Sequence, residues 1–264
     1  MGSRNDIDHG KSYDWGKVSG EYAKYRDIYP DAFYERIVGE GLCVTGQTVL
    51  DLGTGTGVLP RNLCKYGAHF VGTDIAENQI TEARRLSAEQ GLDISYVVSS
   101  AEALDFPDGS FDVVLACMCF FYFDREVMLP KIHRMLKDGG RFCILYMNWA
   151  SDTLGIAKKS EALVLKYNPL WTGHGMPRVP PDAPAWTKAL FDVVSEIAYD
   201  IDIPFTRESW QGQMKTCRGI GASSLSDNDI KLFEQDHRDA LRSVPESFLI
   251  PHYVTMLHLK KKHL

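Results

Sequence analysis

Glycines and a carboxylate gather in one short segment of this 264-residue chain. The segment reads VLDLGTGTG over residues 49–57, and Gly53, Gly55 and Gly57 remove three β-carbons within five residues. Glycine at this density weakens helices and strands, and it is typical of a loop that turns sharply or lets a ligand approach the main chain. Asp51 lies two residues before the first glycine. The segment therefore predicts a binding loop whose ligand accepts a negative charge beside it.

Three kinds of nucleotide ligand can be compared at this loop. A phosphate-binding loop ends in Gly-Lys-Ser/Thr, but Gly57 is followed by Val58 and Leu59. A dinucleotide loop of the G-x-G-x-x-G type needs glycine where Val58 stands, and the carboxylate of Asp51 would repel a pyrophosphate. A cationic nucleoside suits the acid: S-adenosylmethionine carries a sulfonium and an α-ammonium and no phosphate, so Asp51 can bind the ammonium directly or through water. A loop that only turns is the alternative without a ligand.

The segment resembles motif I of the class I S-adenosylmethionine-dependent methyltransferases, in particular the small-molecule, UbiE-like (methyltransferase type 11) group. Asp74 ends the strand candidate VGTD, 17 positions after Gly57, where the resemblance implies an acid that accepts both ribose hydroxyls. A helix N-cap ahead of Glu77 is the other interpretation of Asp74. Residues 106–112 and 136–140 match the family's turns into strands four and five.

Two more segments match the family. After the third strand, the resemblance implies that the backbone N–H of Ala101 and the carboxylate of Glu102 bind the adenine, although Glu102 is also typical of a helix start. In the N-terminal Y-x-x-x-R, Tyr22 and Arg26 are implied to cover the cofactor, with the guanidinium near the methionyl carboxylate; a surface ion pair is the alternative. The full set of implied cofactor-binding residues is Tyr22, Arg26, Asp51, Gly53, Thr54, Gly55, Gly57, Asp74, Ile75, Ser100, Ala101, Glu102, Cys117 and Met118.

The acceptor site is expected at the end of the fourth strand and in the insertion that follows the fifth. Cys119, Tyr122, Trp149 and Trp171 are the candidates for contact with the acceptor. His174, between two glycines, is the candidate general base, with a loop histidine of no role as the alternative. The two neighbouring cysteines of Cys-x-Cys have no matching second pair, so buried thiols and no metal are expected. His133 and His237 fall in charged helices and are expected at the surface.

An aromatic-rich cap is expected over the acceptor, because such a cap would shield a small, partly apolar molecule from water. Arg207, Lys215 and Arg218 can bind a carboxylate on that molecule or form a solvated helix face. The aromatic residues expected in the cap, for which ordinary core positions are the alternative, are Trp149, Tyr167, Trp171, Trp186 and Trp210.

The implied reaction is in-line displacement at the methyl carbon, which leaves S-adenosylhomocysteine as the product. Holding the two reactants in line can supply about 7–11 kcal/mol of the barrier, and a general base is needed only where the acceptor keeps its proton at neutral pH. The runner-up interpretations are an RNA or protein methyltransferase, a protein that binds S-adenosylmethionine without catalysis, and a nicotinamide-dependent dehydrogenase.

The elements that must position these residues alternate between short β-rich runs and helical runs, which predicts an α/β, Rossmann-like three-layer sandwich. Its seven-stranded sheet is expected to be mostly parallel, with an antiparallel last strand and a helical cap. We expect one domain over 1–264, with N-terminal helices over 1–45, cap regions at 148–190 and 206–222, a mobile tail over 1–9, and a helix stop and turn at 137–140. The expected strands are 48–52, 70–73, 94–99, 111–116, 141–147, 193–205 and 252–259, and the expected helices are 15–26, 31–39, 58–66, 77–89, 125–136, 154–166 and 227–242.

The charge, the apolar runs and the cysteines of the sequence limit the classes of partner that are expected. The net charge is −6 with no long block of like charge, and strand four ends without an Asn/Asp-Pro-Pro-aromatic tetrad, so a nucleic-acid substrate is not expected. No apolar run is long enough to cross a bilayer, and six scattered cysteines show no disulfide pattern, so no membrane partner and a cytoplasmic location are expected. The partner expected is a small-molecule acceptor, and the oligomeric state stays open.

Overall fold

The structure is a computed structural model that describes residues 6–151, 155–179 and 184–263. The chain forms two compact units. Unit 1 comprises Met1–Ile28, Asn148–Arg178 and Asp200–Tyr253, and unit 2 comprises Tyr29–Met147, Val179–Tyr199 and Val254–Leu264. The single domain expected over 1–264 stays a prediction.

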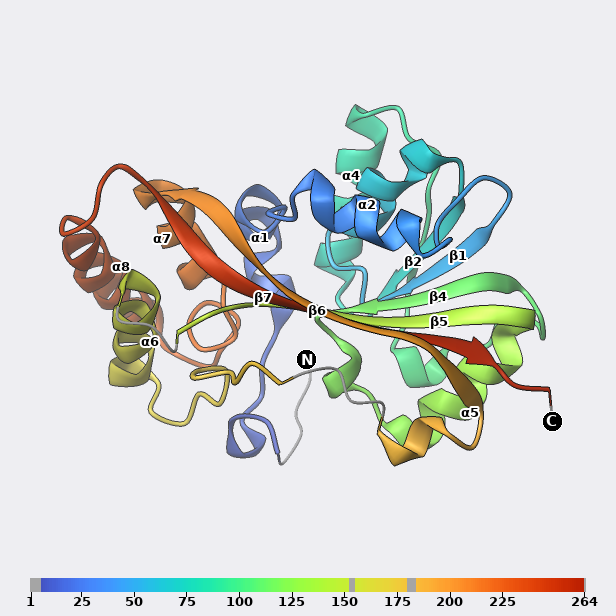
Figure 1. The fold of residues 1–264 in the computed structure, drawn as a ribbon. Coiled ribbons are helices and arrows are strands. Elements are labelled where there is room, and N and C mark those ends of the chain that lie inside the picture. Colours follow the sequence, from blue (N-terminus) through green and yellow to red (C-terminus); the bar gives the residue numbers. More distant parts are fainter. Residues whose placement is uncertain (1–5, 152–154, 180–183, 264) are drawn as a thin grey trace. The chain divides into compact units, whose positions relative to one another are not determined.

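A seven-stranded sheet in the order β3-β2-β1-β4-β5-β7-β6 organises unit 2. Strands β1 to β5 pair in parallel, and the last strand is antiparallel, which confirms the Rossmann-like sandwich (Figure 1). The strand order reverses between β1 and β4, the place where open α/β sheets bind ligands. The strands are β1 (Thr48–Leu52), β2 (His69–Asp74), β3 (Ser95–Val98), β4 (Phe111–Cys117), β5 (Leu136–Trp149), β6 (Phe191–Thr206) and β7 (Ser247–Lys261).

Helices cover both faces of this sheet. In Figure 1, α2 and α4 lie on one face and α5 lies on the other. The helices of unit 2 are α2 (Asp31–Gly39), α3 (Val58–Leu63), α4 (Glu77–Glu89) and α5 (Arg125–Met135), with the 3-10 turns η3 (Cys64–Tyr66), η4 (Ala101–Ala103), η5 (Phe120–Tyr122) and η6 (Ala185–Thr187).

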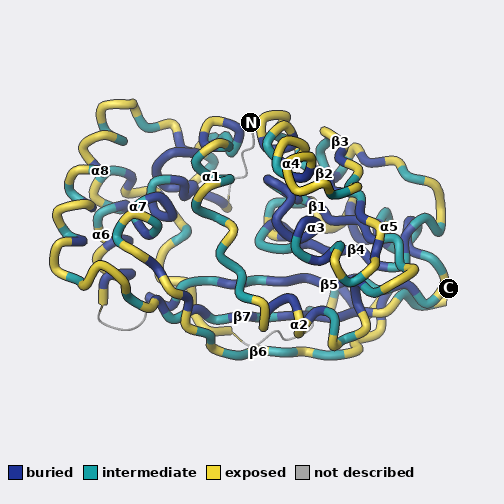
Figure 2. Tube along the Cα trace, turned by 90° about the horizontal axis from the view of Figure 1, so that it is seen from above, coloured by how far each residue is buried: buried dark blue, intermediate teal, exposed yellow. Residues whose placement is uncertain are grey.

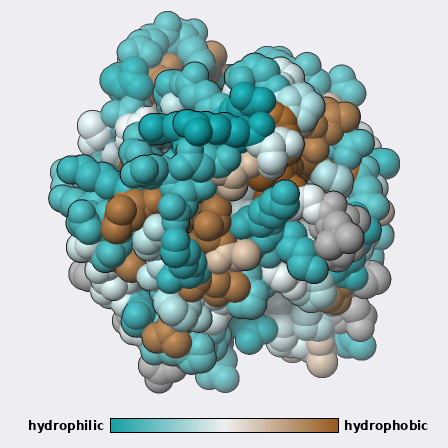
Figure 3. Space-filling model, turned by 90° about the vertical axis from the view of Figure 1, so that its left-hand side faces the viewer, coloured by the Kyte–Doolittle hydropathy of each residue, from teal (hydrophilic) through white to brown (hydrophobic). Residues whose placement is uncertain are grey.

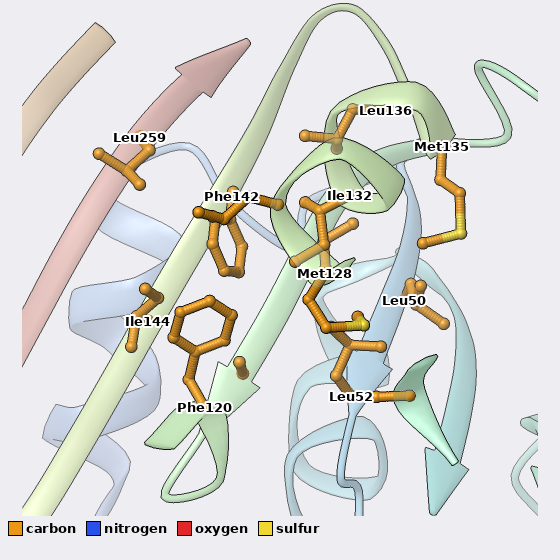
Figure 4. Close-up of a cluster of buried hydrophobic side chains, with 14 of the residues drawn as sticks. Leu50, Leu52, Phe120, Met128, Ile132, Met135, Leu136, Phe142, Ile144 and Leu259 are labelled. Carbon is orange, nitrogen blue, oxygen red and sulfur yellow. The ribbon is translucent and has the colours of Figure 1, made fainter. Parts of the chain in front are cut away.

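The core beneath α5 follows from the alternation of the strands. Every second residue of a strand faces the same side, so Leu50 and Leu52 of β1 point toward α5 together with Phe142 and Ile144 of β5. Helix α5 packs Met128, Ile132 and Met135, which recur at helical spacing, against these strand residues (Figure 4). Figure 2 shows β1 and β4 buried almost throughout, whereas β6 has many exposed residues.

The helix stop and turn expected at residues 137–140 is wrong, because these residues belong to β5. Leu136 pairs with Phe111, and the next pair joins Arg141 to Val113, so the ladder is irregular between them. Gly139 lies in this irregular part of the strand and has a left-handed φ of +73°, which glycine adopts readily. A glycine pair that is typical of a turn thus lies within a strand as a bulge.

Unit 1 is built from helices around Trp210, whose side chain is fully buried. The rings of Phe205 and Trp149 lie 4.9 Å and 5.8 Å from the Trp210 ring. On the face that Figure 3 shows, hydrophilic residues surround several separate hydrophobic patches. The helices of unit 1 are α1 (Ser19–Tyr25), α6 (Ile156–Tyr167), α7 (Arg207–Lys215) and α8 (Asp227–Leu241), with the 3-10 turns η1 (Asp8–Gly10) and η2 (Trp15–Val18).

The mobile tail expected over residues 1–9 is wrong for Asp8, which is 3% exposed and accepts a hydrogen bond from the backbone N–H of Thr172. Residues 1–5 of that expectation lie outside the described part of the chain. Among the described residues, no helix has the length and apolar character needed to cross a lipid bilayer.

Candidate functional site

The glycine loop joins β1 to α3 in unit 2, and its three glycines all adopt left-handed backbone angles. The φ values are +61° at Gly53, +56° at Gly55 and +74° at Gly57. Residues with a β-carbon rarely adopt this conformation, which explains the spacing of the glycines. Thr54, which is buried, fixes the loop on the sheet by donating its N–H to the carbonyl of Thr73 at 2.8 Å.

Two of these glycines also lie against the protein's own side chains. A β-carbon at Gly53 would lie 2.8 Å from the Cβ of Cys119, and one at Gly57 would overlap the Tyr96 hydroxyl. The sequence alone suggested only that a ligand approaches the main chain here. The structure adds a second reason for Gly53 and Gly57, which is close packing within unit 2.

Asp51 lies near the end of β1 and is 2% exposed. Burial and, secondarily, the negative charge of Asp74 raise its pKa to about 7. Among the described residues, no lysine or arginine is a cause of the pKa shift of Asp51. A buried acid with this pKa is half ionised at neutral pH and would be fully ionised beside a bound cation.

Asp74 ends β2, the strand beside β1, and orders the loop between β1 and α3. Its carboxylate accepts the backbone N–H of Gly55 at 3.0 Å and that of Ala76 at 2.9 Å. Burial raises the pKa of Asp74, and these two N–H groups oppose that effect. The bond to Ala76 is the capping contact that the sequence offered as an alternative to ribose binding. Ile75 follows with a side chain that is 55% exposed, which leaves an apolar surface beside the acid.

These features fit S-adenosylmethionine. Two carboxylates without a described basic partner stand at the ends of neighbouring strands, with a loop of left-handed glycines between them. Phosphate ligands would be repelled by such a site, whereas an ammonium or a pair of ribose hydroxyls finds acceptors there.

The residues expected around the adenine follow β3. Ser100 caps η4 by accepting the backbone N–H of Ala103, and Ala101 is buried. Glu102 accepts the backbone N–H of Asp124 at 3.0 Å, so one of its oxygens is held by the start of α5. The adenine-binding roles of Ala101 and Glu102 stay predictions.

The end of β4 places two thiols and a strained methionine beside the glycine loop. Cys119 donates its thiol to the carbonyl of Leu52 at 3.0 Å, and Cys117 donates to the Tyr29 hydroxyl at 3.5 Å. Between them, Met118 has a φ of +57°, a conformation that costs about 1 kcal/mol or more outside glycine and is often found at binding sites. Its sulfur accepts the backbone N–H of Met147 at 3.0 Å.

Burial raises the pKa of the Cys117 thiol to about 12. Burial also raises the pKa of the Cys119 thiol well above its usual value. We therefore expect both to remain thiols at pH 8 and to resist iodoacetamide in the folded protein, because only the thiolate reacts. Cys64 and Cys117 are both half-buried, but burial of the Cys117 thiol raises its pKa to about 12, so Cys64 should be alkylated first. Mass spectrometry of labelled peptides, with unfolded protein as the control, measures this; rapid labelling of Cys117 would contradict the raised pKa of its thiol.

Tyr22 and Arg26 lie in unit 1. The Arg26 guanidinium lies 5.5 Å from the centre of the Tyr22 ring, and it donates to Thr216 Oγ1 at 2.9 Å and to the carbonyl of Gln213 at 2.8 Å. The arginine therefore has protein partners of its own. Its expected place near the methionyl carboxylate stays a prediction.

Trp149, Trp171 and His174 also belong to unit 1. Trp171 is 3% exposed, and its ring lies 6.0 Å from that of His174, which is exposed. Trp149 donates its indole N–H to Glu161 at 2.8 Å. In unit 2, Tyr122 ends η5 and is half-buried. The acceptor contacts and the general-base role expected for these residues stay predictions.

One expectation about the surface is wrong. His237 is fully buried and not at the surface: it bonds Ser160 Oγ at 2.8 Å, and burial lowers its pKa to about 4. Trp186 belongs to unit 2, where its ring lies 5.7 Å from that of Phe120. The basic residues expected in the cap also bind the protein's own groups: Arg207 donates to the carbonyl of Val244, Lys215 pairs with Glu21 and Glu234, and Arg218 pairs with Asp8. The binding of an acceptor carboxylate by these residues, and the place of Trp186 in the cap, stay predictions.

Sequence reasoning did not single out Tyr29, Asp8 or Glu161. The pair Tyr29-Pro30 was a possible signal, because a residue before proline is held extended and can reach the end of a neighbouring strand. The sequence held no signal that Asp8 and Glu161 would be buried, because an acid in a polar segment or an amphipathic helix is usually exposed.

Comparisons with known proteins identify the family of the chain. Residues 50–144 match a family model described as a methyltransferase domain. A demethylmenaquinone methyltransferase of Thermus thermophilus is 41% identical over 102 residues, which cover 38% of this chain and 46% of that protein. A ubiquinone biosynthesis O-methyltransferase of Bradyrhizobium diazoefficiens is 31% identical over 215 residues, covering 75% of this chain and 83% of that protein.

The matches to the first three curated relatives span about half the length of each, from 46% to 54%. Among solved structures, a phosphoethanolamine N-methyltransferase 2 of Haemonchus contortus aligns with a TM-score of 0.55 at 18% identity and covers 93% of this chain and 57% of that one. At this level of identity the likeness shows the fold alone.

Proposed function

The chain belongs to the class I S-adenosylmethionine-dependent methyltransferases, and we propose that it transfers the cofactor's methyl group to a small-molecule acceptor. The observation that carries this proposal is Asp51, a buried carboxylate at the end of β1 with no described basic partner, beside a loop of left-handed glycines. That combination suits a cationic nucleoside and disfavours a phosphate.

The chain's own residues have distinct tasks in this proposal. Asp51 would hold the ammonium and Asp74 the ribose hydroxyls, while Asp74 also keeps the loop ordered through Gly55. When bound, the cofactor supplies an electrophilic methyl carbon on a positively charged sulfur. No thiolate competes as a nucleophile at the end of β4, because burial keeps Cys117 and Cys119 protonated.

Catalysis then depends mainly on holding the acceptor in line, which can contribute about 7–11 kcal/mol. A proton acceptor is needed only for an acceptor that reacts through a protonated hydroxyl or amine, and His174 is the candidate. The relatives support a small molecule as acceptor, since the printed names of two of them refer to demethylmenaquinone and to ubiquinone biosynthesis. The net charge of −6 does not favour a nucleic acid.

We further propose a reducing, cytoplasmic setting. All six cysteines are free thiols, and four of them are buried. Proteins that work in oxidising compartments usually pair such residues in disulfides.

Calorimetry and methyl labelling test the proposal together. S-adenosylmethionine and S-adenosylhomocysteine should bind with Kd values of about 1–100 μM, and reduced nicotinamide dinucleotide should not bind. With methyl-labelled cofactor, label should pass to a member of a panel that contains a catechol, a naphthoquinol and phosphoethanolamine. Label found only in added RNA or protein would replace the small-molecule acceptor by a macromolecule. Binding without transfer to any acceptor, in the panel or in a metabolite extract, would indicate a non-catalytic binder.

A further inference from the structure

Helix α2 of unit 2 is held by polar contacts at both of its ends. Phe33, Tyr34 and Ile37 lie on one side of the helix and are buried. Apolar contacts are not directional, so they keep the helix on the sheet without fixing its position along its own axis. That position depends on the polar contacts of Tyr29, which stands just before the helix, and of Glu40, which follows its last residue.

The carboxylate of Glu40 holds the C-terminal end of α2 to the last two strands of the sheet. Its Oε2 accepts the hydroxyl of Ser195 in β6 at 2.7 Å and lies 3.3 Å from Nδ1 of His258 in β7. The hydrogen bond from Ser195 is the main cause that holds the pKa of Glu40 below its usual value. His258 is buried, so its contact with the carboxylate is shielded from water. One side chain thus joins α2 to strands that lie 155 and 218 residues further along the chain.

The other end of α2 reaches the carboxyl edge of the sheet through Tyr29. Its ring stacks on that of Phe33, in the first turn of the helix, with 4.6 Å between the ring centres. Its hydroxyl accepts the thiol of Cys117, the last residue of β4, at 3.5 Å. Because the Tyr29 ring is stacked on a buried residue of α2, a shift of the helix would move the hydroxyl away from this thiol.

Cys117 begins the segment that borders the glycine loop. The next residue, Met118, has a φ of +57°, and a residue with a β-carbon keeps such a conformation only where its surroundings enforce it. Cys119 lies so close to the loop that a β-carbon at Gly53 would be 2.8 Å from its own Cβ. Besides burial, the negative charge of Asp51 raises the pKa of both thiols, which places them within its electrostatic reach. A hydrogen bond at the end of β4 therefore helps to shape the loop that we assign to the cofactor.

We propose that Tyr29 and Glu40 are positioning residues of the cofactor site and that they act through the position of α2 along its axis. Glu40 sets the helix against β6 and β7, and Tyr29 transmits that setting to Cys117 at the end of β4. Residue 40 lies beyond a helix of nine residues, about 14 Å long, so it controls the loop without touching the cofactor. The inference rests on the proposed cofactor site and adds two residues that lie outside the glycine loop.

The test compares the wild type with Tyr29→Phe, Glu40→Ala and the double variant. Glu40→Gln is the conservative replacement, because its amide oxygen can still accept the hydroxyl of Ser195. If Glu40→Ala does not fold, Ser195→Ala takes its place; it removes only one of the two contacts of Glu40, so a rise in Kd of about twofold is expected. Glu35→Gln is the matched control, because Glu35 is an exposed carboxylate of α2 with no hydrogen bond or ion pair to the part of the chain that the structure describes.

Amide hydrogen exchange in the cofactor-free protein tests the contacts themselves. The amide of Met118 bonds the carbonyl of Leu145 at 2.9 Å, and the amide of Met147 bonds Sδ of Met118 at 3.0 Å. Exchange at both amides should become about fivefold faster in Y29F and about threefold faster in E40A, and it should keep the wild-type rate in E35Q. Wild-type rates in Y29F would show that the Tyr29 hydroxyl does not hold the end of β4, and the proposal would fail.

Calorimetry with S-adenosylmethionine tests the effect on the cofactor site. Kd should rise about tenfold in Y29F and about fivefold in E40A, and it should stay within about twofold of the wild type in E40Q. The double variant should bind no more weakly than Y29F, because the effect of Glu40 passes through Tyr29. Independent effects would instead multiply to about 50-fold in the double variant, and that result would overturn the transmission through α2. Equal Kd values in the wild type and Y29F would overturn the positioning role of Tyr29.

Failure of the proposed cofactor site is recognised separately. If Asp51→Asn leaves the affinity unchanged, the cofactor lies elsewhere and the positioning role fails together with the site. The exchange rates of the cofactor-free protein still show in that case whether Tyr29 and Glu40 hold α2 and β4 together.

Discussion

Replacing Asp51 by Asn is expected to weaken binding of S-adenosylmethionine about 100-fold. The ammonium would lose a charged partner inside a buried site, and the loss of such a partner costs about 3 kcal/mol. Isothermal calorimetry of the two proteins at pH 7.5 measures the change. An affinity within about threefold of the wild type would remove Asp51 from the cofactor site.

The same residue should make the wild type's affinity depend on pH. In the free protein burial raises the pKa of Asp51 to about 7, and a bound ammonium would lower it, so a proton must leave when the ligand binds below that pH. The Kd should rise about tenfold per pH unit as the pH falls from 7 toward the pKa of the complex, while Asp51→Asn shows no such slope. A flat wild-type profile between pH 5 and 7.5 would contradict the assignment.

The stability of the cofactor-free protein should depend on pH in the opposite direction to its cofactor affinity: stability falls as the pH rises, whereas affinity increases. The folded pKa lies above the value of 3.8 for a free aspartate, so ionisation of Asp51 destabilises the free protein above pH 3.8, and the full effect is reached above about pH 7. Asp51→Asn should therefore increase the free energy of unfolding at pH 8 by on the order of 4 kcal/mol, and the gain should shrink as the pH falls toward 4. Urea unfolding at several pH values measures it.

Asp112→Asn is the matched control. Asp112 lies in β4, where its Oδ2 accepts from Lys137 at 2.7 Å and from the backbone N–H of Thr48 at 2.8 Å. Despite partial burial, these donors hold the pKa of Asp112 below its usual value. The substitution should lower stability above that pKa and leave cofactor affinity unchanged.

Replacing Gly57 by Ala should destabilise the free protein by about 3 kcal/mol. Alanine would have to keep a φ of +74° and its β-carbon would overlap the Tyr96 hydroxyl, which itself bonds Ser87 Oγ at 2.9 Å. The backbone conformation costs about 1–2 kcal/mol, and forced repacking of a filled site typically costs another 1–3 kcal/mol. Urea unfolding without cofactor gives the value.

Gly91→Ala isolates the backbone contribution. Gly91 has a φ of +65°, but a β-carbon there would meet nothing within 4 Å, so only about 1 kcal/mol should be lost. If Gly57→Ala instead keeps the stability of the wild type and loses only cofactor affinity, then ligand approach and not packing is the reason for this glycine.

The sequence predicted the strands and the loop well, because their signals are local. Strand β1 and helices α2 and α4 begin and end at the residues expected from the alternation of apolar residues, from turn residues and from helix caps. The acids at the site were found for the same reason: parallel strands bring their carboxyl ends to one edge of a sheet, so an acid near the end of β1 and one at the end of β2 must be neighbours.

Local signals failed where a residue's surroundings come from distant parts of the chain. Residues 137–140 contain the glycine pair of a turn, yet pairing with β4 keeps them in a strand. His237 has charged neighbours along its helix, yet α6 supplies Ser160 and closes the site around it. Periodicity reports which side of an element is apolar, but not which other element covers it.

By itself, then, the chain's order of residues determined the Rossmann-like sheet, the family and the placement of Asp51 and Asp74 beside a glycine loop, since each depends on spacing along one or two adjoining elements. Only the tertiary structure decided that Asp51 has no described basic partner and a pKa near 7, that Gly53 and Gly57 lie against Cys119 and Tyr96, and that the buried carboxylates of Asp8 and Glu161 accept the backbone N–H groups of residues 172 and 175. Burial and its electrostatic consequences arise from contacts between segments far apart in sequence, and no local pattern encodes them.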